Sequence, residues 1–268
     1  MRVLLKTLLL SFTLTAALLS QAADNRLTLT GSSTVAPLAS EIAKRFESKH
    51  PGVRIDVQMG GSSRGINDAR MGLADIGMVS RALKPTEQDL SAFLIAMDGI
   101  GLILHKSNAV NTLSNTQIID IYIGKITHWK QVGGPDLPIT VVNKAEGRST
   151  LELFLHYFAL KNSQIKAHVV VGDNQQGIKT VSGNPGAIGY VSIGTAEYEE
   201  DRGTPIKLLP MAGQPATVEA VAKGGYPLSR PLNLVIKKTR SGLVKDFIAF
   251  AQSAEVKNLV EAQFFVAP

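Results

Sequence analysis

The chain contains no cysteine among its 268 residues. This absence excludes a disulfide framework and any metal site built on thiolates. It also excludes attachment to a membrane through a lipid-modified N-terminal cysteine. A protein of this composition depends on its hydrophobic core and its hydrogen bonds for stability.

Long apolar runs are also scarce, and the clearest one lies at the N-terminus. Arg2 and Lys6 precede an apolar run over residues 8–19, and small residues follow up to Ala23. A membrane-spanning helix needs ~20 apolar residues, whereas this pattern is typical of a cleaved export signal. We expect residues 1–22 to be a signal peptide and the remainder to be a diffusible, monomeric protein of the Gram-negative periplasm.

Neither sign of charge dominates, with 28 Lys and Arg against 22 Asp and Glu. The basic residues are scattered among acidic ones instead of clustering as nucleic-acid binding requires. The histidines lack both the i, i+4 spacing and the grouping of a metal set. We therefore expect no nucleic-acid partner, no metal and no cofactor.

Short β-branched segments alternate with longer amphipathic ones, which predicts an α/β fold with mixed, mainly parallel sheets flanked by helices. The first elements are strands at Arg26–Thr30, Val53–Gln58 and Asp75–Val79, separated by helices at Val35–Phe46 and Ile66–Met71. This order is typical of a βαβαβ unit.

The length fits two lobes of ~100 to 150 residues each. We place lobe 1 at residues 23–103 plus 228–268 and lobe 2 at residues 104–227, with two crossings at a hinge. Within lobe 2, Trp129 is expected to pack inside, and the charged run Glu197–Arg202 is expected to be a solvated loop.

Three polar loops each follow a predicted strand and open a predicted helix: Thr30–Val35, Gly60–Gly65 and Ala145–Leu151. The first N–H groups of a helix lack intrahelical partners and carry the positive end of the helix dipole, so they favour anions. Each loop alone is an ordinary N-cap. Because loops at the carboxyl ends of strands converge on one crevice, the three together predict an oxyanion site.

A fourth segment, Ala74–Arg81, ends a predicted strand on a hydroxyl and a guanidinium. A guanidinium can donate two hydrogen bonds to one oxyanion. An arginine on the surface without a ligand is the alternative interpretation of Arg81.

Several stretches of the chain, from about residue 27 to its end, resemble the phosphate-binding receptors of phosphate-specific ABC importers. They read TGSSTVAPLASEIAKRFESKHP, GGSSRGINDARMGLADIGMVSRALK, MDGIGLILHKSN, LSNTQIIDIYIGKITHWKQVGG, GNPGAIGYVSIG and GGYPLSRPLNLVIKK. The resemblance implies a two-lobed type II periplasmic-binding-protein fold with two hinge strands. It also implies capture of inorganic phosphate between the lobes and delivery to the permease subunits of an ABC importer.

The resemblance further implies a set of ligand-binding residues in the four segments. They are Ser33, Thr34 and Val35; Ser62 and Ser63; Ser80 and Arg81; and Lys144, Glu146, Gly147, Arg148, Ser149 and Thr150.

Two departures from the family pattern stand out. The last loop usually begins with arginine and carries a ligand serine, but here Lys144 and Arg148 occupy those places. Many receptors of the family use an aspartate to accept the phosphate proton, where this chain has Arg81. We expect another carboxylate to accept that proton, with Glu146 as the first candidate, Asp98 as the second and Asp75 as the third.

Two alternative functions remain open. Gly61–Gly65 fits the Gly-x-Ser-x-Gly nucleophile elbow of α/β-hydrolases, with Ser63 as nucleophile. The motif comes too early in the chain for a hydrolase sheet, so we expect no enzyme. An oxyanion-binding protein used in signalling or adhesion is the second alternative, because fold does not fix function.

Overall fold

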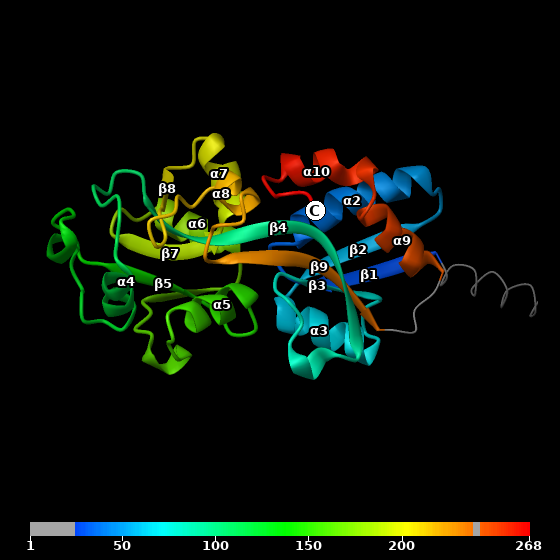
Figure 1. Cartoon of the computed structure of the whole chain (residues 1–268), viewed down its shortest axis with the longest axis horizontal. Helices are drawn as coiled ribbons and strands as arrows, with labels where there is room; N and C mark the ends of the chain where they lie inside the picture. The colour runs from blue at the N-terminus through cyan, green and yellow to red at the C-terminus, as the bar shows by residue number, and fades with distance from the viewer. Residues whose placement is uncertain (1–24, 238–241) are drawn as a thin grey trace, which may run out of the picture.

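The computed structural model describes residues 25–237 and 242–268. Helices flank a curled mixed sheet whose strand order is β2-β1-β3-β9-β4-β7-β5-β6, with β8 paired to β4 outside this path (Figure 1). This confirms the predicted mixed α/β fold class. The predicted signal peptide, residues 1–22, lies outside the described residues.

The first half of the molecule holds the N-terminal and C-terminal elements. Its elements are β1 (Arg26–Gly31), α2 (Ala36–Lys49), β2 (Arg54–Met59), α3 (Ser62–Met71), β3 (Ile76–Val79), η1 (Pro85–Glu87), α9 (Leu243–Ala251), η4 (Ala254–Val256) and α10 (Lys257–Ala262). Strand β1 pairs in parallel with β2 and β3, as the predicted βαβαβ unit requires.

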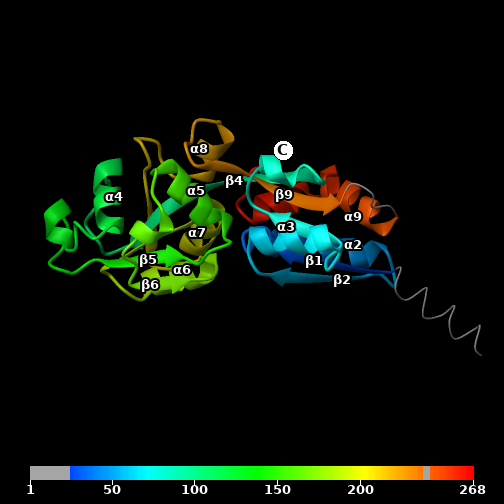
Figure 2. The ribbon, with the colours of Figure 1, turned by 90° about the horizontal axis from the view of Figure 1, so that it is seen from below.

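The second half holds the middle of the chain. Its elements are α4 (Asn115–Tyr122), η2 (Trp129–Val132), β5 (Thr140–Lys144), α5 (Ser149–Tyr157), η3 (Asn162–Gln164), β6 (Val169–Val171), α6 (Asn174–Ser182), β7 (Ala187–Ser192), α7 (Ile193–Asp201), β8 (Ile206–Leu209) and α8 (Val218–Ala222). Strand β5 pairs in parallel with β6 and β7. Figure 2 shows the two halves side by side, with β2 and α3 in one and β6 and α6 in the other.

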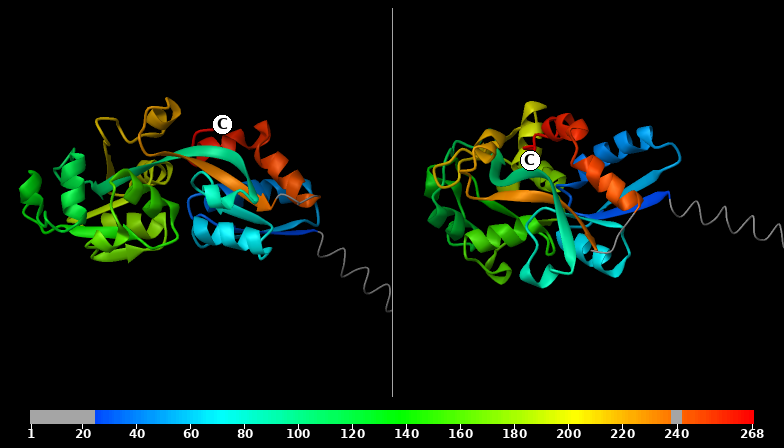
Figure 3. Two further views of the ribbon diagram at one scale, coloured as in Figure 1. Left: turned by 60° about the horizontal axis from the view of Figure 1, so that its bottom comes forward. Right: turned by 45° about the vertical axis from the view of Figure 1, so that its right-hand side comes forward.

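Two long strands join the halves: β4 (Leu90–His105) and β9 (Ser229–Lys237). They pair antiparallel from Leu90 to Gly99 of β4, and β4 then continues into the second half to pair with β7 and β8. Figure 3 shows both strands crossing between the halves from two further directions. The domain boundaries at 103/104 and 227/228 stay predictions.

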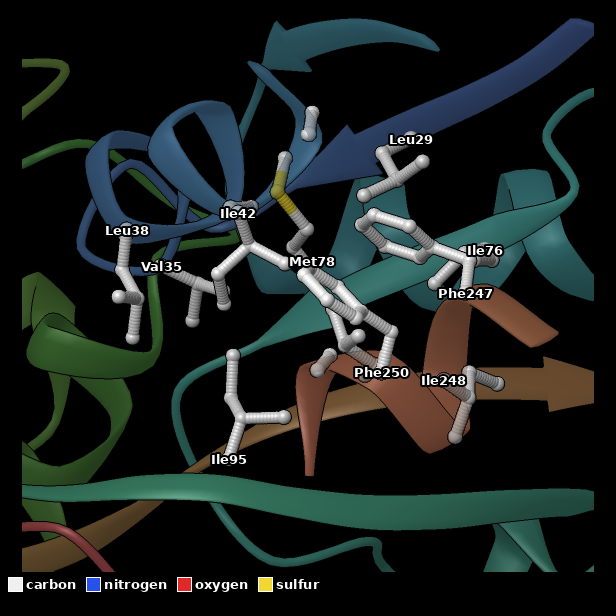
Figure 4. Packing of buried hydrophobic residues seen from close by; sticks show 14 of the residues in the cluster. Leu29, Val35, Leu38, Ile42, Ile76, Met78, Ile95, Phe247, Ile248 and Phe250 are labelled. Atoms are coloured by element: carbon white, nitrogen blue, oxygen red, sulfur yellow. The ribbon is translucent and has the colours of Figure 1, made fainter. Parts of the chain in front are cut away.

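Each half has its own hydrophobic core. In the first half Leu38, Ile42 and Phe46 are one helical turn apart on α2 and at most 1 % exposed, as their spacing predicts. They belong to one buried cluster with Leu29, Ile76, Met78, Phe247 and other apolar residues of the sheet and of α9 (Figure 4).

Trp129 is fully buried in the core of the second half, and its Nε1 donates to the carbonyl of Gly186 at 2.9 Å. The prediction that Trp129 packs inside is confirmed. The prediction of a solvated loop over Glu197–Arg202 is wrong, because α7 extends to Asp201. Glu197 is half-buried on that helix and accepts a hydrogen bond from the Val218 amide.

Candidate oxyanion site

A small hollow lies where loops from both halves meet. Its volume is about 10 Å³, roughly the space of one water molecule. The lining residues are Ser32, Ser33, Thr34, Gly61, Ser62, Ser80, Arg148, Ser149 and Thr150. The structure therefore brings together parts of all four predicted segments, and hydroxyl groups dominate the lining.

The first loop enters α2 through a tight turn at Gly31. This glycine has φ +134°, and a Cβ there would lie 2.3 Å from the carbonyl of Met78 on β3. Ser32 Oγ accepts from the amides of Thr34 and Val35 at 3.2 and 3.3 Å. The Val35 amide, a predicted ligand donor, thus already faces a protein acceptor, while the Thr34 side chain lines the hollow.

The second and fourth segments are joined by serine hydroxyls. Ser62 Oγ, on the first turn of α3, accepts from the Ser80 amide at 3.2 Å. Ser80 Oγ in turn accepts from Ser32 Oγ at 3.0 Å. All three serines are at most 2 % exposed. These bonds fix the ends of β1, β2 and β3 relative to one another.

The third loop, which belongs to the second half, supplies Arg148, Ser149 and Thr150 to the lining of the hollow. Gly147 has φ +77°, and α5 begins at Ser149. Arg148 Nε and Ser149 Oγ are buried and have no hydrogen-bond partner. Because buried polar groups normally have partners, these two donors at the start of a nine-residue helix are suited to an oxyanion in the hollow.

Lys144 lies behind this loop and does not line the hollow. Its Nζ donates to the carbonyl of Asp173 at 2.5 Å, and burial lowers its pKa to about 7, with the nearby cations Arg230 and Arg148 adding to the effect and Asp173 opposing it. The lysine that stands in place of the family's usual arginine is therefore turned toward Asp173 and the start of α6.

Three carboxylates were expected to accept the phosphate proton, and none of them lines the hollow: Glu146, Asp98 and Asp75. Glu146 Oε1 accepts from Asn162 Nδ2 at 3.0 Å. Asp75 Oδ2 accepts from the Thr28 amide, beside the start of β3 and away from its carboxyl end. Both carboxylates therefore accept hydrogen bonds from groups outside the hollow.

Arg81 is turned away from the hollow toward two carboxylates. Its Nη1 and Nη2 donate to Glu87 at 2.8 and 2.9 Å, and its Nε lies 3.2 Å from Glu152 Oε2. We expected Arg81 to donate two hydrogen bonds to an oxyanion. In the structure both of its Nη groups donate to Glu87 instead.

Ser63, the candidate nucleophile, also pairs with a carboxylate. Its Oγ donates to Glu152 Oε1 at 3.2 Å, and its amide donates to the Gly147 carbonyl at 3.2 Å. The Ser63 hydroxyl therefore faces a carboxylate instead of the histidine of a catalytic triad.

The sequence predictions missed Arg230, although its side chain contacts residues of three of the four segments that line the hollow. It is 1 % exposed on β9 and pairs with Asp98 on the neighbouring strand β4, with Nε and Nη2 at 3.0 and 2.8 Å from Asp98 Oδ2. Its remaining N–H groups face Thr150, Thr34 and Ser80. An acidic residue inside one apolar strand and a basic residue inside another are a sequence signal for such a buried pair.

The chain matches known proteins over nearly its whole length. A family model described as the PBP superfamily domain matches residues 19–255. Among the described residues, no helix is long and apolar enough to cross a membrane. The chain is therefore a PBP-superfamily protein whose two halves meet at a hollow.

Individual relatives narrow this class. A Clostridium perfringens protein assigned as a phosphate ABC transporter substrate-binding protein, solved with bound phosphate, is 35 % identical and has a TM-score of 0.84, covering 91 % of this chain and 100 % of that chain. A phosphate transport receptor from Vibrio cholerae is 31 % identical, with a TM-score of 0.74 and the same coverage.

The phosphate-binding protein PstS of Bacillus subtilis is 28 % identical over 91 % of this chain and 81 % of its own length. The chain belongs to the family of phosphate-binding receptors of ABC importers, within the PBP superfamily.

Proposed function

We propose that this chain captures inorganic phosphate in the hollow between its halves and delivers it to the permease subunits of an ABC importer. The observation that carries the proposal is the hollow itself. Hydroxyls from both halves line it, and two buried donors, Arg148 Nε and Ser149 Oγ, lack partners there. Such an array of donors suits an anion with several oxygens.

The relatives support phosphate as the ligand, since the Clostridium perfringens protein was solved with phosphate bound. We place the ligand contacts at Ser33, Thr34, Ser62, Ser80, Arg148, Ser149 and Thr150. Val35, Ser63, Arg81, Lys144, Glu146 and Gly147 then support these contacts without lining the hollow. A signal peptide over residues 1–22, a periplasmic location and a monomeric state belong to the same proposal.

Binding is tested by calorimetric titration of Thr34→Ala and Ser62→Ala with phosphate. Each removes one desolvated donor to a charged ligand, which is worth roughly 1.5 to 3 kcal/mol or about 10- to 150-fold in affinity. Ser48→Ala, an exposed serine at the far end of α2, is the control and should bind as the wild type does. Wild-type affinity in both site variants would reject this location.

Delivery is tested separately from binding. A strain lacking the gene should take up less radioactive phosphate at low external concentration, and the wild-type gene should restore uptake. Restoration by a variant that no longer binds phosphate would separate this chain's role from transport and favour signalling or adhesion.

A further inference from the structure

Arg230 has a protein acceptor for each of its N–H groups. A guanidinium has five N–H donors in a fixed plane. Here Nε and one Nη2 hydrogen face Asp98, the second Nη2 hydrogen faces Thr34 Oγ1 at 3.2 Å, and Nη1 faces Thr150 Oγ1 at 2.9 Å and Ser80 Oγ at 3.5 Å. Four of the five N–H groups therefore have acceptors within 3.2 Å, and the fifth has a longer contact with Ser80. The three hydroxyl residues that Arg230 contacts all line the hollow.

Asp98 is itself held in place. Its Oδ1 accepts from the amide of Gly194 near the start of α7, at 3.2 Å, while Oδ2 accepts from Arg230. Asp98 and Arg230 are also opposite each other in the register of β4 and β9, the two strands that join the halves. These contacts hold the Asp98–Arg230 pair in one position on the strands that join the two halves.

The contacts restrict what the threonine hydroxyls can do. A hydroxyl oxygen has two lone pairs and one hydrogen. Both lone pairs of Thr34 are engaged, one by Arg230 Nη2 and one by Asn174 Nδ2 at 3.1 Å. The Thr34 hydroxyl can then only donate, and the ligand atom that meets it must accept a hydrogen bond.

We propose that Arg230, held by Asp98, is a positioning residue that fixes the hydroxyls of Thr34 and Thr150, one from each half, as donors to the bound oxyanion. This inference rests on the proposed function. A buried ion pair with a purely structural role is the alternative.

A double-mutant cycle separates the two roles. Thr34→Val removes the hydroxyl, and Arg230→Lys keeps the charge but loses the planar fork of donors. We expect each to weaken phosphate binding about 10-fold or more. Because Arg230 acts through Thr34, the double variant should lose less than the product of the two single losses, by roughly 5-fold or more.

Arg70→Lys combined with Thr34→Val is the matched control. Arg70 pairs with Asp89 on the outside of the first half, so its loss should combine with Thr34→Val multiplicatively. If Arg230→Lys and Thr34→Val also combine multiplicatively, Arg230 does not act through Thr34 and the proposal is overturned.

A measurement on the wild-type protein keeps the proposal testable if Arg230→Lys does not fold. Nuclear magnetic resonance of the guanidinium should show separate signals for Nη1 and Nη2, with and without phosphate, because both groups are held. A single averaged signal would overturn the proposal. A wild-type protein that binds no phosphate would refute the proposed function, whereas the resonance experiment would still decide whether Arg230 is held.

Discussion

Glu152 makes the clearest set of contacts between the two halves outside the hollow. It lies on α5 in the second half, and its partners lie in the first half. Its Oε1 accepts from Ser63 Oγ at 3.2 Å, and its Oε2 lies 2.7 Å from Lys84 Nζ and 3.2 Å from Arg81 Nε. We predict that Glu152→Gln weakens phosphate binding by destabilising the closed arrangement of the halves, without touching the ligand.

The size of the effect follows from the exposure of the groups. The Glu152 side chain is 26 % exposed and that of Lys84 is 50 % exposed, so solvent screens part of the attraction. Arg81 is 5 % exposed, but Glu87 still neutralises it when Glu152 is replaced. We therefore expect a loss of about 1 to 2 kcal/mol, combining one screened pair with one partly buried pair.

Phosphate should then bind more weakly, provided that the halves of the ligand-free protein are mostly apart. The apparent affinity is reduced by the fraction of molecules that can reach the binding-competent state. A cost of about 1 to 2 kcal/mol then corresponds to about 5- to 30-fold weaker binding. Contacts between the halves slow the escape of the ligand. The weaker binding should therefore appear mainly as a faster dissociation rate.

Calorimetry gives the affinity, and stopped-flow release of phosphate gives the dissociation rate. Asp89→Asn is the control, because it removes an ion pair with Arg70 that lies within the first half. Its affinity should equal that of the wild type. Glu152→Gln with unchanged affinity and unchanged dissociation rate would refute the reasoning that these contacts hold the halves together.

Two further predictions concern folding. Because burial lowers the pKa of Lys144 to about 7, against ~10.4 in an unfolded chain, the unfolded state binds more protons between these values, and the free energy of unfolding should rise as pH increases from about 7 toward 10. Denaturant unfolding at several pH values should show a smaller rise in Lys144→Met, and equal slopes would contradict the assignment. Gly65→Ala should lower stability by about 1 to 3 kcal/mol and weaken phosphate binding, because its Cβ would lie 2.8 Å from the carbonyls of Met78 and Thr30 and displace α3, which carries Ser62. Gly225→Ala has open space around it and should unfold at the wild-type temperature, so a Gly65→Ala variant that matches it would reject the packing argument.

Local patterns predicted much of the fold correctly. The apolar spacing of α2 and the strand segments of the βαβαβ unit follow from short-range periodicity, and the structure matches them within a few residues. The long strand β4 was missed. Gly99 and Gly101 interrupt its apolar pattern, and the reason for them is tertiary: a Cβ on Gly99 would lie 2.7 Å from Ile193, and one on Gly101 would lie 2.5 Å from Leu208.

The hollow was predictable in its loops but not in its charges. Serines and threonines before helices are a local signal, and their convergence follows from strand topology. The pairing of Arg81 with Glu152 and of Arg230 with Asp98 joins residues far apart in the chain. No local pattern says which of several cations faces the ligand and which faces a carboxylate.

Binding of phosphate between the two halves is the property on which the proposed function depends. The most direct test is calorimetric titration of phosphate-stripped protein with phosphate, for the wild type and for Thr34→Ala/Ser62→Ala side by side. We expect saturable binding of one phosphate per chain in the wild type, and binding weakened by at least ~10-fold in the double variant. A wild type that releases no binding heat at several temperatures and retains no phosphate in equilibrium dialysis would contradict it.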